Sequence, residues 1–457
     1  MASRFTFPRF RSRSAAVFGI IAALAGSIAS ATPPVSAYAD QRPTDTICGT
    51  AASTGGFAAT DLPDIHAPEA IVMGQDGTVY FEREADKQVR IASITKVMTA
   101  IVALENSQLT DTVTVDHAAA TVGQSSADLK EGDTMDMRTA LKCLLIPSGN
   151  DAAMAIASSV GKLIDPASTN PYQVFIDAMN KKAAELGMQG SLFENPHGLD
   201  FDGWEGNLHS TARDVATMFA YAMKNNDFRT LTAEADNKVT VTDKDGKPRE
   251  LELTERNSIL GKDGNIGGKT GGTYEALQCF VGGFSRETGG EVYTVVLGCD
   301  GDEERFADTL TLANWYYNHI ATIPLANTQT KSGDTPIIGR ATAGDWSDRT
   351  VDVTLANPSK TVQTFSLAGK IEQDVKLDTL SGSIAAGEDA GTITYTQNGK
   401  KLAEEKLVTV KGQEAPTPLQ WLMVQFDRVV RFFENKPETA PAEVLNEAPD
   451  PTAFDAV

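Results

Sequence analysis

Residues 91–99 read Ile-Ala-Ser-Ile-Thr-Lys-Val-Met-Thr, which places Ser93 and Lys96 three positions apart at the start of an apolar helical pattern. Residues three apart share one face of a helix, so the lysine amine can meet the serine hydroxyl. A lysine buried beside other cationic and polar groups has a lowered pKa and can accept the serine proton. The stretch therefore predicts a nucleophilic serine with a lysine base, on a helix that begins near residue 93.

Two further short motifs lie later in the chain. Ser148-Gly149-Asn150 comes directly after an apolar run, and a hydroxyl and an amide two residues apart on a tight loop can both point into one cleft. Lys269-Thr270-Gly271, followed by Gly272, lies in a glycine-rich strand. It offers a charge and a hydroxyl to a carboxylate, and its glycines let a substrate backbone lie against the strand. The two-glycine frame of a phosphate-binding Walker loop is absent.

Each motif is weak on its own, because the chain repeats two of them elsewhere. Ser-x-x-Lys recurs at Ser159–Lys162 inside an Ala-rich helical pattern, and Ser-x-Asn recurs at Ser168–Asn170. All three motifs in this order are much more specific. With Ser-Asp-Asn in the middle, the trio is typical of class A β-lactamases and penicillin-binding proteins.

In this chain the middle motif is Ser-Gly-Asn, and its neighbourhood supports a narrower assignment. The flanking runs at 146–152, 195–200 and 210–214 carry the same likeness. From about residue 65 to 433 the chain resembles the serine-type D-alanyl-D-alanine carboxypeptidases. These are the low-molecular-weight penicillin-binding proteins of peptidase family S11. The acidic tail after Lys436 falls outside the resemblance.

The resemblance implies a catalytic role for three residues. Ser93 attacks the carbonyl between two terminal D-alanines of a peptidoglycan stem peptide and forms an acyl-enzyme. Lys96 is the general base, and Ser148 relays a proton toward the departing D-alanine. β-Lactams then act as covalent inhibitors that mimic the substrate and deacylate slowly. No cofactor and no metal is expected.

The resemblance also implies a set of substrate-binding residues. Asn150 orients Lys96 and binds the substrate amide, and Lys269 supplies positive potential. Thr270 binds the terminal carboxylate, and Gly271 continues the strand along which the substrate lies. The oxyanion sits between the backbone amides of Ser93 and Gly272.

Other polar residues have less specific patterns. Arg213 is a candidate second contact for the carboxylate, and an ion pair on a helix surface explains it equally well. His197, Asp200 and Asp214 invite a Ser-His-Asp interpretation, but the Gly-x-Ser-x-Gly elbow of such enzymes is absent. His197 is therefore expected to be a hydrogen-bonded turn residue.

The order of apolar patterns predicts an α+β fold. Helical and antiparallel-strand patterns alternate up to about residue 322, and β-branched runs with Gly, Asp and Ser turns come after them. The resemblance implies a penicillin-binding/β-lactamase-like catalytic domain, an antiparallel sheet with flanking helices. The expected order is a signal peptide (1–39), a linker (40–62), the catalytic domain (63–325), a small β-rich domain (330–412), an amphipathic membrane-associating helix (416–435) and an acidic disordered tail (436–457).

The two ends of the chain predict an exported protein. Four arginines and no acid precede an apolar run and small residues near Ala39, as in a signal peptide; a retained membrane anchor is the alternative. Residues 418–433 carry apolar side chains at helical spacing. The run is too short and too charged to span a bilayer but suits a helix in the membrane interface, here at the outer face of the cytoplasmic membrane or the cell wall. The alternative is an ordinary helix packed on the β domain.

Charge and cysteine content narrow the choice of partners. A net charge of −21 leaves no basic surplus for phosphates, so a nucleic-acid partner is not expected. Cys279 and Cys299 lie in neighbouring strand patterns and could form a disulfide, which would leave Cys48 with Cys143. Four free buried thiols are equally compatible with the sequence. No Cys-x-x-Cys spacing suggests zinc.

Three other functions share part of this pattern. A serine β-lactamase needs a deacylating water, usually held by a glutamate between the second and third motifs, where Glu194 lies. A D,D-endopeptidase that cuts cross-links carries the same motifs. A non-catalytic wall-binding protein would have no need of the pair Ser93 and Lys96.

Overall fold

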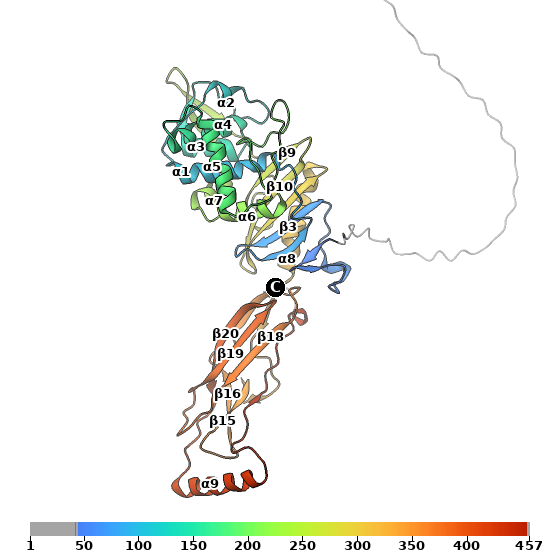
Figure 1. Cartoon of the computed structure of the whole chain (residues 1–457), viewed down its shortest axis with the longest axis vertical. Coiled ribbons are helices and arrows are strands. Elements are labelled where there is room, and N and C mark those ends of the chain that lie inside the picture. The colour runs from blue at the N-terminus through green and yellow to red at the C-terminus, as the bar shows by residue number, and fades with distance from the viewer. Residues whose placement is uncertain (1–41, 43, 455–457) are drawn as a thin grey trace, which may run out of the picture. The chain divides into compact units, whose positions relative to one another are not determined.

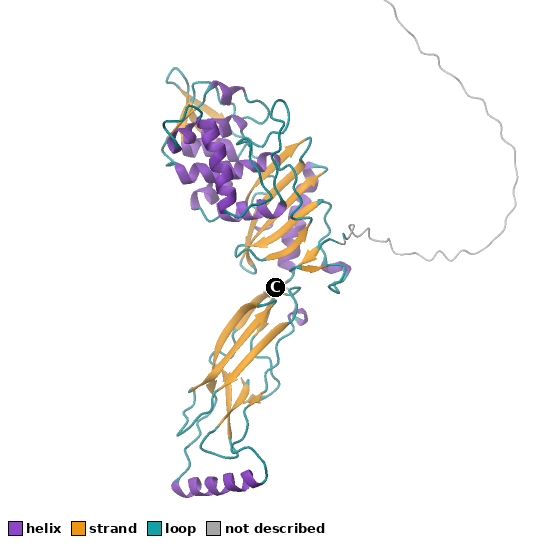
Figure 2. Cartoon of the chain, in the orientation of Figure 1, coloured by secondary structure: helices purple, strands orange, loops and turns teal. Residues whose placement is uncertain are grey.

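The computed structural model of the protein describes residues 42 and 44–454 (Figure 1). The predicted signal peptide, 1–39, lies outside the described residues. Helices gather in one part of the catalytic region, whereas strands form its other part and most of the chain after residue 320 (Figure 2). This is the predicted α+β fold.

One antiparallel sheet of seven strands is the framework of the catalytic region. Its order is β2 (Thr50–Ala51), β1 (Thr46–Ile47), β4 (Val79–Arg83), β3 (Glu69–Gly74), β11 (Gly290–Cys299), β10 (Leu277–Arg286) and β9 (Asn265–Thr273). β3 and β4 form a hairpin, and the neighbouring strand patterns that carry Cys279 and Cys299 form the antiparallel pair β10 and β11. Strand β9 lies at the sheet edge, so one of its sides has no described strand beside it.

Both faces of this sheet are covered by helices, and β11 shows how the sequence achieves this. Successive side chains of a strand point to opposite faces. Tyr293 and Val295 enter the apolar cluster on the side of α6 (Ala212–Ala222). Val296 enters the cluster on the side of α8 (Asp302–Asn318). A strand whose sequence is continuously apolar is therefore buried on both of its faces.

Four helices pack around α4 (Asn150–Ile164), which is rich in alanine and largely buried: α1 (Lys96–Asn106), α2 (His117–Thr121), α3 (Met137–Leu145) and α5 (Pro171–Glu185). Helix α7 (Asn226–Thr232) packs against α3 and β9. A small sheet adds β5 (Thr112–Thr114), β6 (Thr134–Asp136), β7 (Lys238–Thr242) and β8 (Pro248–Glu252). Small side chains let neighbouring helices approach α4 closely.

Helix α6 is capped by Thr211 and not by the adjacent Ser210. The Thr211 side chain accepts a hydrogen bond from the Asp214 backbone N–H. The Ser210 hydroxyl instead contacts the Ser191 hydroxyl at 2.8 Å. Ser210 and Thr211 are adjacent in the chain, and the contact with Ser191 determines which of them caps the helix.

The predicted small β domain contains a six-stranded sheet. Its order is β18 (Ile371–Leu377), β19 (Asp389–Gln397), β20 (Lys400–Thr409), β16 (Thr350–Leu355), β15 (Gly339–Thr342) and β21 (Glu443–Val444). Two strand pairs lie beside it, β12 (Ile320–Pro324) with β17 (Thr361–Phe365) and β13 (Lys331–Ser332) with β14 (Thr335–Pro336). Two apolar clusters fill this part of the chain.

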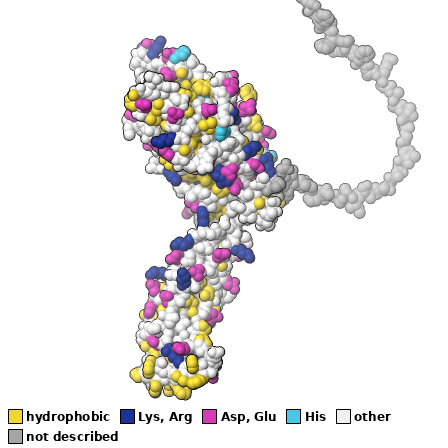
Figure 3. Space-filling model, in the orientation of Figure 1, with side chains coloured by type: hydrophobic (Ala, Val, Ile, Leu, Met, Phe, Trp, Pro, Cys, Tyr) yellow, Lys and Arg dark blue, Asp and Glu magenta, His cyan; other side chains and the backbone are white. Residues whose placement is uncertain are grey.

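The amphipathic helix is α9 (Pro418–Phe433), and it presents its apolar side chains to solvent. Val424 is its one buried residue, and Arg428 donates a hydrogen bond of 2.6 Å to the Gly344 carbonyl. Figure 3 shows apolar side chains gathered over this helix. Exposed apolar residues are Leu419, Trp421, Leu422, Met423, Phe426, Val429, Phe432 and Phe433. No helix among the described residues is long and apolar enough to cross a membrane.

Two segments are more ordered than their composition suggests. In the predicted linker, β1 pairs with β4, and buried Asp45 forms an ion pair with Arg83. In the predicted disordered tail, β21 pairs with β15, and Asn446 is buried. The prediction of disorder is wrong for residues 436–454. The segment has no apolar face of its own, but it contributes backbone and one buried amide to the β domain.

All four cysteines are free thiols. Strand pairing places Gln278, not Cys279, opposite Cys299, and the two sulfur-bearing side chains enter clusters on different faces of the sheet. Burial raises the pKa of Cys279 to about 12. Of the two alternatives that the sequence leaves open, the structure has the free thiols, since strand neighbours with opposite orientations cannot form a disulfide.

Candidate active site

The first motif lies where a 3₁₀ turn, Ala92–Thr95, runs into α1. Ser93 is half-buried, whereas Lys96 is fully buried one turn further on. Lys96 Nζ lies 2.8 Å from Ser93 Oγ. The predicted contact between amine and hydroxyl is present.

Two other oxygens determine how Lys96 is oriented. Its Nζ donates to Asn150 Oδ1 at 2.7 Å and to the His197 carbonyl at 3.0 Å. Both are acceptors without a hydrogen, so in a neutral amine they engage both N–H bonds and leave the lone pair facing the Ser93 hydroxyl. Burial, and after it the charge of Lys269, holds the pKa of Lys96 well below its usual value. Lys96 is thus arranged as a proton acceptor.

The second motif forms a tight corner between α3 and α4. Ser148 has a positive φ of 65°, and Asn150 is the first residue of α4. A Cβ on Gly149 would lie 2.7 Å from the Cys143 carbonyl, so only glycine fits the corner. Buried Asp151 accepts hydrogen bonds from the backbone N–H groups of Ala127 and Leu129, which ties the neighbouring loop to this corner.

The third motif lies on the edge strand β9. Lys269 is buried and donates to Ser148 Oγ at 2.7 Å and to the Thr270 carbonyl at 3.0 Å. Burial, followed by the charge of Arg305, lowers the pKa of Lys269 to about 7. The predicted residues thus form two linked pairs, Ser93 with Lys96 and Ser148 with Lys269.

A cleft of about 790 Å³ connects these groups. Its lining includes Ser93, Ser148, Asn150, Thr270, Gly271 and Gly272. A Cβ on Gly271 would lie 2.4 Å from the Ile91 carbonyl, so this glycine allows β9 to approach the turn that carries the nucleophile. A Cβ on Gly272 would meet only the end of the flexible Gln278 side chain, at 2.9 Å.

An arginine that the sequence did not single out lines the same cleft. Arg305, on α8, donates to the Gly271 carbonyl at 2.8 Å and to Gln278 Oε1 at 2.9 Å. Its side chain also forms an ion pair with Asp302. The sequence around Arg305 has a helical pattern but no recognisable motif, so it gives no sign of a role in the site. Arg305 reaches the site only because α8 packs beneath the sheet.

Arg213 is not among the residues that line this cleft. Its guanidinium forms ion pairs with Asp86, at 2.7 Å, and with Glu82. These ion pairs agree with the alternative interpretation of Arg213, an ion pair on a helix surface. The structure does not bring Arg213 to the site, because the start of α6 packs beside the segment around residue 85.

The residues considered for a Ser-His-Asp triad and for a β-lactamase glutamate have other partners. His197 Nδ1 accepts from the Leu199 backbone N–H at 3.2 Å, and burial holds its pKa well below its usual value. Asp214 accepts from Gly190 and Ser191 instead of a histidine. Glu194 is exposed, accepts from the Asn207 backbone N–H and does not line the cleft. The predicted turn role of His197 is present, and a Ser-His-Asp triad is not.

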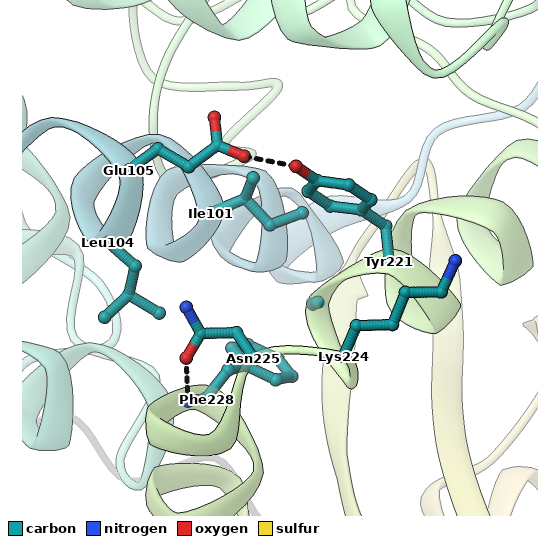
Figure 4. Close-up of a pocket in the computed structure, with 8 residues that line it drawn as sticks. Ile101, Leu104, Glu105, Tyr221, Lys224, Asn225 and Phe228 are labelled. Carbon is teal, nitrogen blue, oxygen red and sulfur yellow. Dashed lines mark hydrogen bonds between the residues drawn. The ribbon is translucent and has the colours of Figure 1, made fainter.

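A second cavity, of about 290 Å³, lies between α1, α6 and α7 (Figure 4). Ile101 and Phe228 contribute apolar surface to it, and Tyr221 donates a hydrogen bond of 2.6 Å to Glu105. None of the predicted site residues lines this cavity. Among the described residues no group of His, Cys, Asp and Glu side chains is arranged to hold a metal ion.

Comparison with known proteins connects this geometry to a family. The family model described as D-alanyl-D-alanine carboxypeptidase matches residues 57–301. D-alanyl-D-alanine carboxypeptidase DacF of Bacillus subtilis is 26% identical over 350 residues, which cover 74% of this chain and 83% of that protein. D-alanyl-D-alanine carboxypeptidase DacC of Escherichia coli is 29% identical over 379 residues, covering 78% of this chain and 88% of that protein.

Solved structures agree with this result. A mutant of the Streptomyces K15 DD-transpeptidase superposes with a TM-score of 0.52 at 32% identity, covering 56% of this chain and 98% of that one. The DacD carboxypeptidase of Francisella tularensis, at 21% identity and a TM-score of 0.52, shares the fold over 77% of this chain and 94% of its own. The family match spans more than half of the sequence and contains all three motifs, and the chain therefore belongs to the D-alanyl-D-alanine carboxypeptidase family, peptidase S11.

Proposed function

We propose that this protein is a serine D-alanyl-D-alanine carboxypeptidase that removes the terminal D-alanine from peptidoglycan stem peptides. The observation that carries the proposal is the orientation of Lys96. Its buried Nζ donates to two carbonyl-type acceptors and lies 2.8 Å from Ser93 Oγ, so that in its neutral form it can accept the serine proton. A binding protein has no need of a buried, neutral lysine in this position.

Acylation is explained by the two linked pairs. Lys96 takes the proton of Ser93 as its Oγ attacks the carbonyl carbon of the penultimate D-alanine. The C–N bond then breaks and leaves an ester on Ser93. The departing D-alanine amine receives a proton through Ser148, whose hydroxyl is held 2.7 Å from Lys269 Nζ. Charge that develops on the carbonyl oxygen is stabilised by the backbone N–H groups of Ser93 and Gly272.

The terminal carboxylate binds on the other side of the reacting carbon. The Thr270 hydroxyl lines the cleft there, and Lys269 supplies positive potential. Arg305 adds a guanidinium to the same side, and we assign it the second carboxylate contact that the sequence suggests for Arg213. Charged groups in a dry site attract a carboxylate far more strongly than they would in water.

Hydrolysis completes the cycle. Water attacks the ester, the Ser93 hydroxyl is restored, and the shortened peptide leaves with a new carboxylate. A β-lactam opens its ring on Ser93 in the same first step and blocks the site while its ester persists. Glu194, the candidate for a β-lactamase water, is exposed and held by the Asn207 backbone, which favours the carboxypeptidase over the β-lactamase.

The site works outside the cytoplasmic membrane in this proposal. Residues 1–39 have the composition of a signal peptide, and α9 presents large apolar side chains, among them Phe426 (72% exposed) and Phe433 (81% exposed). A surface of this kind on a short helix suits the boundary between lipid headgroups and acyl chains. The partners are therefore peptidoglycan stems in the cell wall and the outer face of the membrane.

The reaction is tested by measuring D-alanine release from a peptide that ends in Lys-D-Ala-D-Ala. The native protein is expected to release D-alanine, and Ser93→Ala is expected to lose release and labelling by penicillin. Ser159→Ala, in the other Ser-x-x-Lys, is the matched control and is expected to keep both. Release from cross-linked dimers but not from this peptide would identify an endopeptidase. Equal release by native protein and Ser93→Ala would contradict the proposal.

A further inference from the structure

The cavity between α1, α6 and α7, of about 290 Å³, lies outside the catalytic cleft (Figure 4). Its apolar lining includes Ile101 and Leu104 of α1 and Phe228 of α7. Ligand pockets usually measure about 300–1,000 Å³, so a space of this size suits a small molecule rather than a long chain. The apolar side chains favour an occupant that removes them from water.

The carboxylate of the lining, Glu105, is already engaged. Its Oε1 accepts from the Tyr221 hydroxyl at 2.6 Å, and its Oε2 lies 2.8 Å from Lys182 Nζ. The ion pair with Lys182 offsets the charge of Glu105. A cationic ligand would have to compete with both of these donors for the carboxylate.

Two other residues of the lining keep donors available. Asn225 caps α7, because its Oδ1 accepts from the backbone N–H groups of Asp227 and Phe228 at 2.8 and 3.2 Å. The Asn225 Nδ2 therefore points away from α7, toward α1 in Figure 4, and it donates to no residue in the described part of the chain. Lys224 is exposed, and its ammonium has no ion-pair partner among the described residues. These groups favour a ligand with a negatively charged acceptor.

The cavity also lies between two helices that hold opposite halves of the catalytic site. Helix α1 begins with Lys96 and presents Ile101 to the cavity. Helix α7 ends at Thr232, whose Oγ1 donates to the Gly268 carbonyl at 3.2 Å and accepts from the Gly268 N–H at 3.1 Å. Gly268 directly precedes Lys269 on β9. An occupant in contact with both helices therefore acts on both linked pairs of the site.

We propose that this cavity binds a small apolar molecule with one carboxylate and that the bound molecule promotes acylation of Ser93. The apolar body packs on Ile101 and Phe228. The carboxylate accepts from Asn225 Nδ2 and pairs with Lys224, and hydrogen bonds to a charged acceptor are stronger than those to a neutral one. The ligand fits the arrangement of α1 and α7 in which both linked pairs are formed, and its binding favours that arrangement.

Binding is measured by NMR titration of the protein with octanoate, octanamide and octylammonium. Native protein is expected to bind octanoate most tightly and octylammonium least. Asn225→Asp keeps the helix cap but replaces the amide donor with a carboxylate. It should weaken octanoate at least about tenfold and leave octanamide within about twofold, whereas a folding defect would weaken both. Equal binding of octanoate by native protein and Asn225→Asp would overturn the site.

Lys224→Met is expected to weaken octanoate less than about fivefold, because the lysine is exposed. Lys162→Met, which removes an exposed charge from α4, is the matched control and should leave octanoate binding unchanged. Tighter binding of octylammonium than of octanoate by native protein would overturn the choice of a carboxylate.

Benzylpenicillin separates this cavity from the catalytic cleft, which also attracts carboxylates. Octanoate is expected to bind protein whose Ser93 already carries penicillin, and loss of binding there would place the ligand in the cleft and overturn the site. Saturating octanoate is expected to raise the rate of penicillin acylation at least about twofold in native protein. Thr232→Val removes the hydroxyl that ties α7 to β9, and it should keep octanoate binding but lose this increase.

The two parts of the proposal fail separately. An unchanged acylation rate with octanoate bound would overturn the effect on the catalytic site and leave the binding site standing. The effect on acylation rests on the proposed role of Ser93, whereas octanoate binding does not. No acylation of native protein by penicillin would contradict that role together with the effect, and the binding measurements would still decide the site.

Discussion

Lys96 and Lys269 are both buried beside the cleft, yet the proposed reaction needs one of them neutral and the other charged. Lys96 must be neutral to accept the Ser93 proton, and Lys269 must be charged to attract a carboxylate. Burial lowers the pKa of both side chains, and the charge of Lys269 lowers that of Lys96 further. This coupling favours the neutral form of Lys96 whenever Lys269 holds its proton.

The pH dependence of the reaction should reflect these two lysines. We expect kcat/KM to rise with pH as Lys96, whose pKa burial lowers, loses its proton, and to fall as pH increases through the Lys269 pKa of about 7. A bound carboxylate stabilises charged Lys269, so the falling limb of kcat should lie at higher pH than that of kcat/KM. Steady-state kinetics across the acidic, neutral and alkaline ranges test this, and identical falling limbs would contradict it.

Stability should also depend on the protonation of Lys269. Its folded pKa of about 7 lies below the ordinary value of 10.5, so between these values the unfolded chain binds more protons than the native protein. Raising the pH through this window therefore stabilises the native protein relative to Lys269→Met, by at most about 1.4 kcal/mol per pH unit. Thermal unfolding of both proteins at several pH values within this window measures the difference. A difference that stays constant with pH would contradict the lowered pKa.

Among the elements of the catalytic region, the loop after Asn195 is fitted against the turn that carries the nucleophile. Gly198 has φ +85°, and a Cβ on it would lie 1.9 Å from the Ala92 carbonyl. The His197 carbonyl of the same loop accepts from Lys96. A shift of this loop therefore moves both the residue before Ser93 and an acceptor of its base.

Gly198→Ala is expected to lower kcat by more than about tenfold and to reduce the melting temperature by several degrees, since the added methyl group meets backbone. Gly203→Ala is the matched control in the same loop: φ is +89°, but nothing lies within 4 Å of the added Cβ. It should cost only the strain of a left-handed residue, about 1–2 kcal/mol, with little change in kcat. D-alanine release and thermal unfolding of both variants test this. Equal effects on kcat would show that backbone strain, not the contact with Ala92, matters.

In the molecule as a whole, the acidic tail completes the β domain. The Asn446 side-chain amide donates to Gln373 Oε1 at 2.9 Å and to the Tyr395 hydroxyl at 3.1 Å, and its Oδ1 accepts from the Asn327 backbone N–H at 2.7 Å. Asn446→Ala removes these three hydrogen bonds, although the Tyr395 hydroxyl keeps its bond to the Leu325 carbonyl. The variant is expected to lose about 1–3 kcal/mol in the free energy of unfolding. Glu438→Ala, on the exposed part of the tail, should be neutral, and an equally neutral Asn446→Ala would show that the tail is dispensable.

The proposed membrane association of α9 likewise concerns the molecule as a whole. Leu422 and Phe426 lie four residues apart on the exposed side of α9. Leu422→Glu with Phe426→Glu is expected to abolish binding to phospholipid vesicles, because charges replace the apolar contact. Gln420→Glu adds a charge on the opposite side of the helix, where the side chain accepts from the Thr417 backbone N–H, and should weaken binding only slightly. Co-sedimentation with vesicles measures this, and unchanged binding of the double variant would contradict the proposed role of α9.

Features that depend on local spacing could be predicted from the sequence. Ser93 and Lys96 meet because three residues make nearly one helical turn, and Ser148 and Asn150 share a corner because they are two positions apart. The helical pattern that begins near residue 93 becomes the turn Ala92–Thr95 and α1, and the neighbouring strand patterns become β10 and β11. The family could be recognised from the order of the motifs, which is itself a property of the sequence.

Tertiary packing determines which distant groups meet. Arg305 rather than Arg213 reaches the cleft, and the His197 carbonyl becomes an acceptor for Lys96. The orientation of Cys279 away from Cys299 and the burial of Asn446 in the β domain are of the same kind. No local period encodes these contacts, because each depends on how elements far apart in the chain pack together. A pattern of residues shows which face of an element is apolar, and only packing shows what that face and its polar neighbours touch.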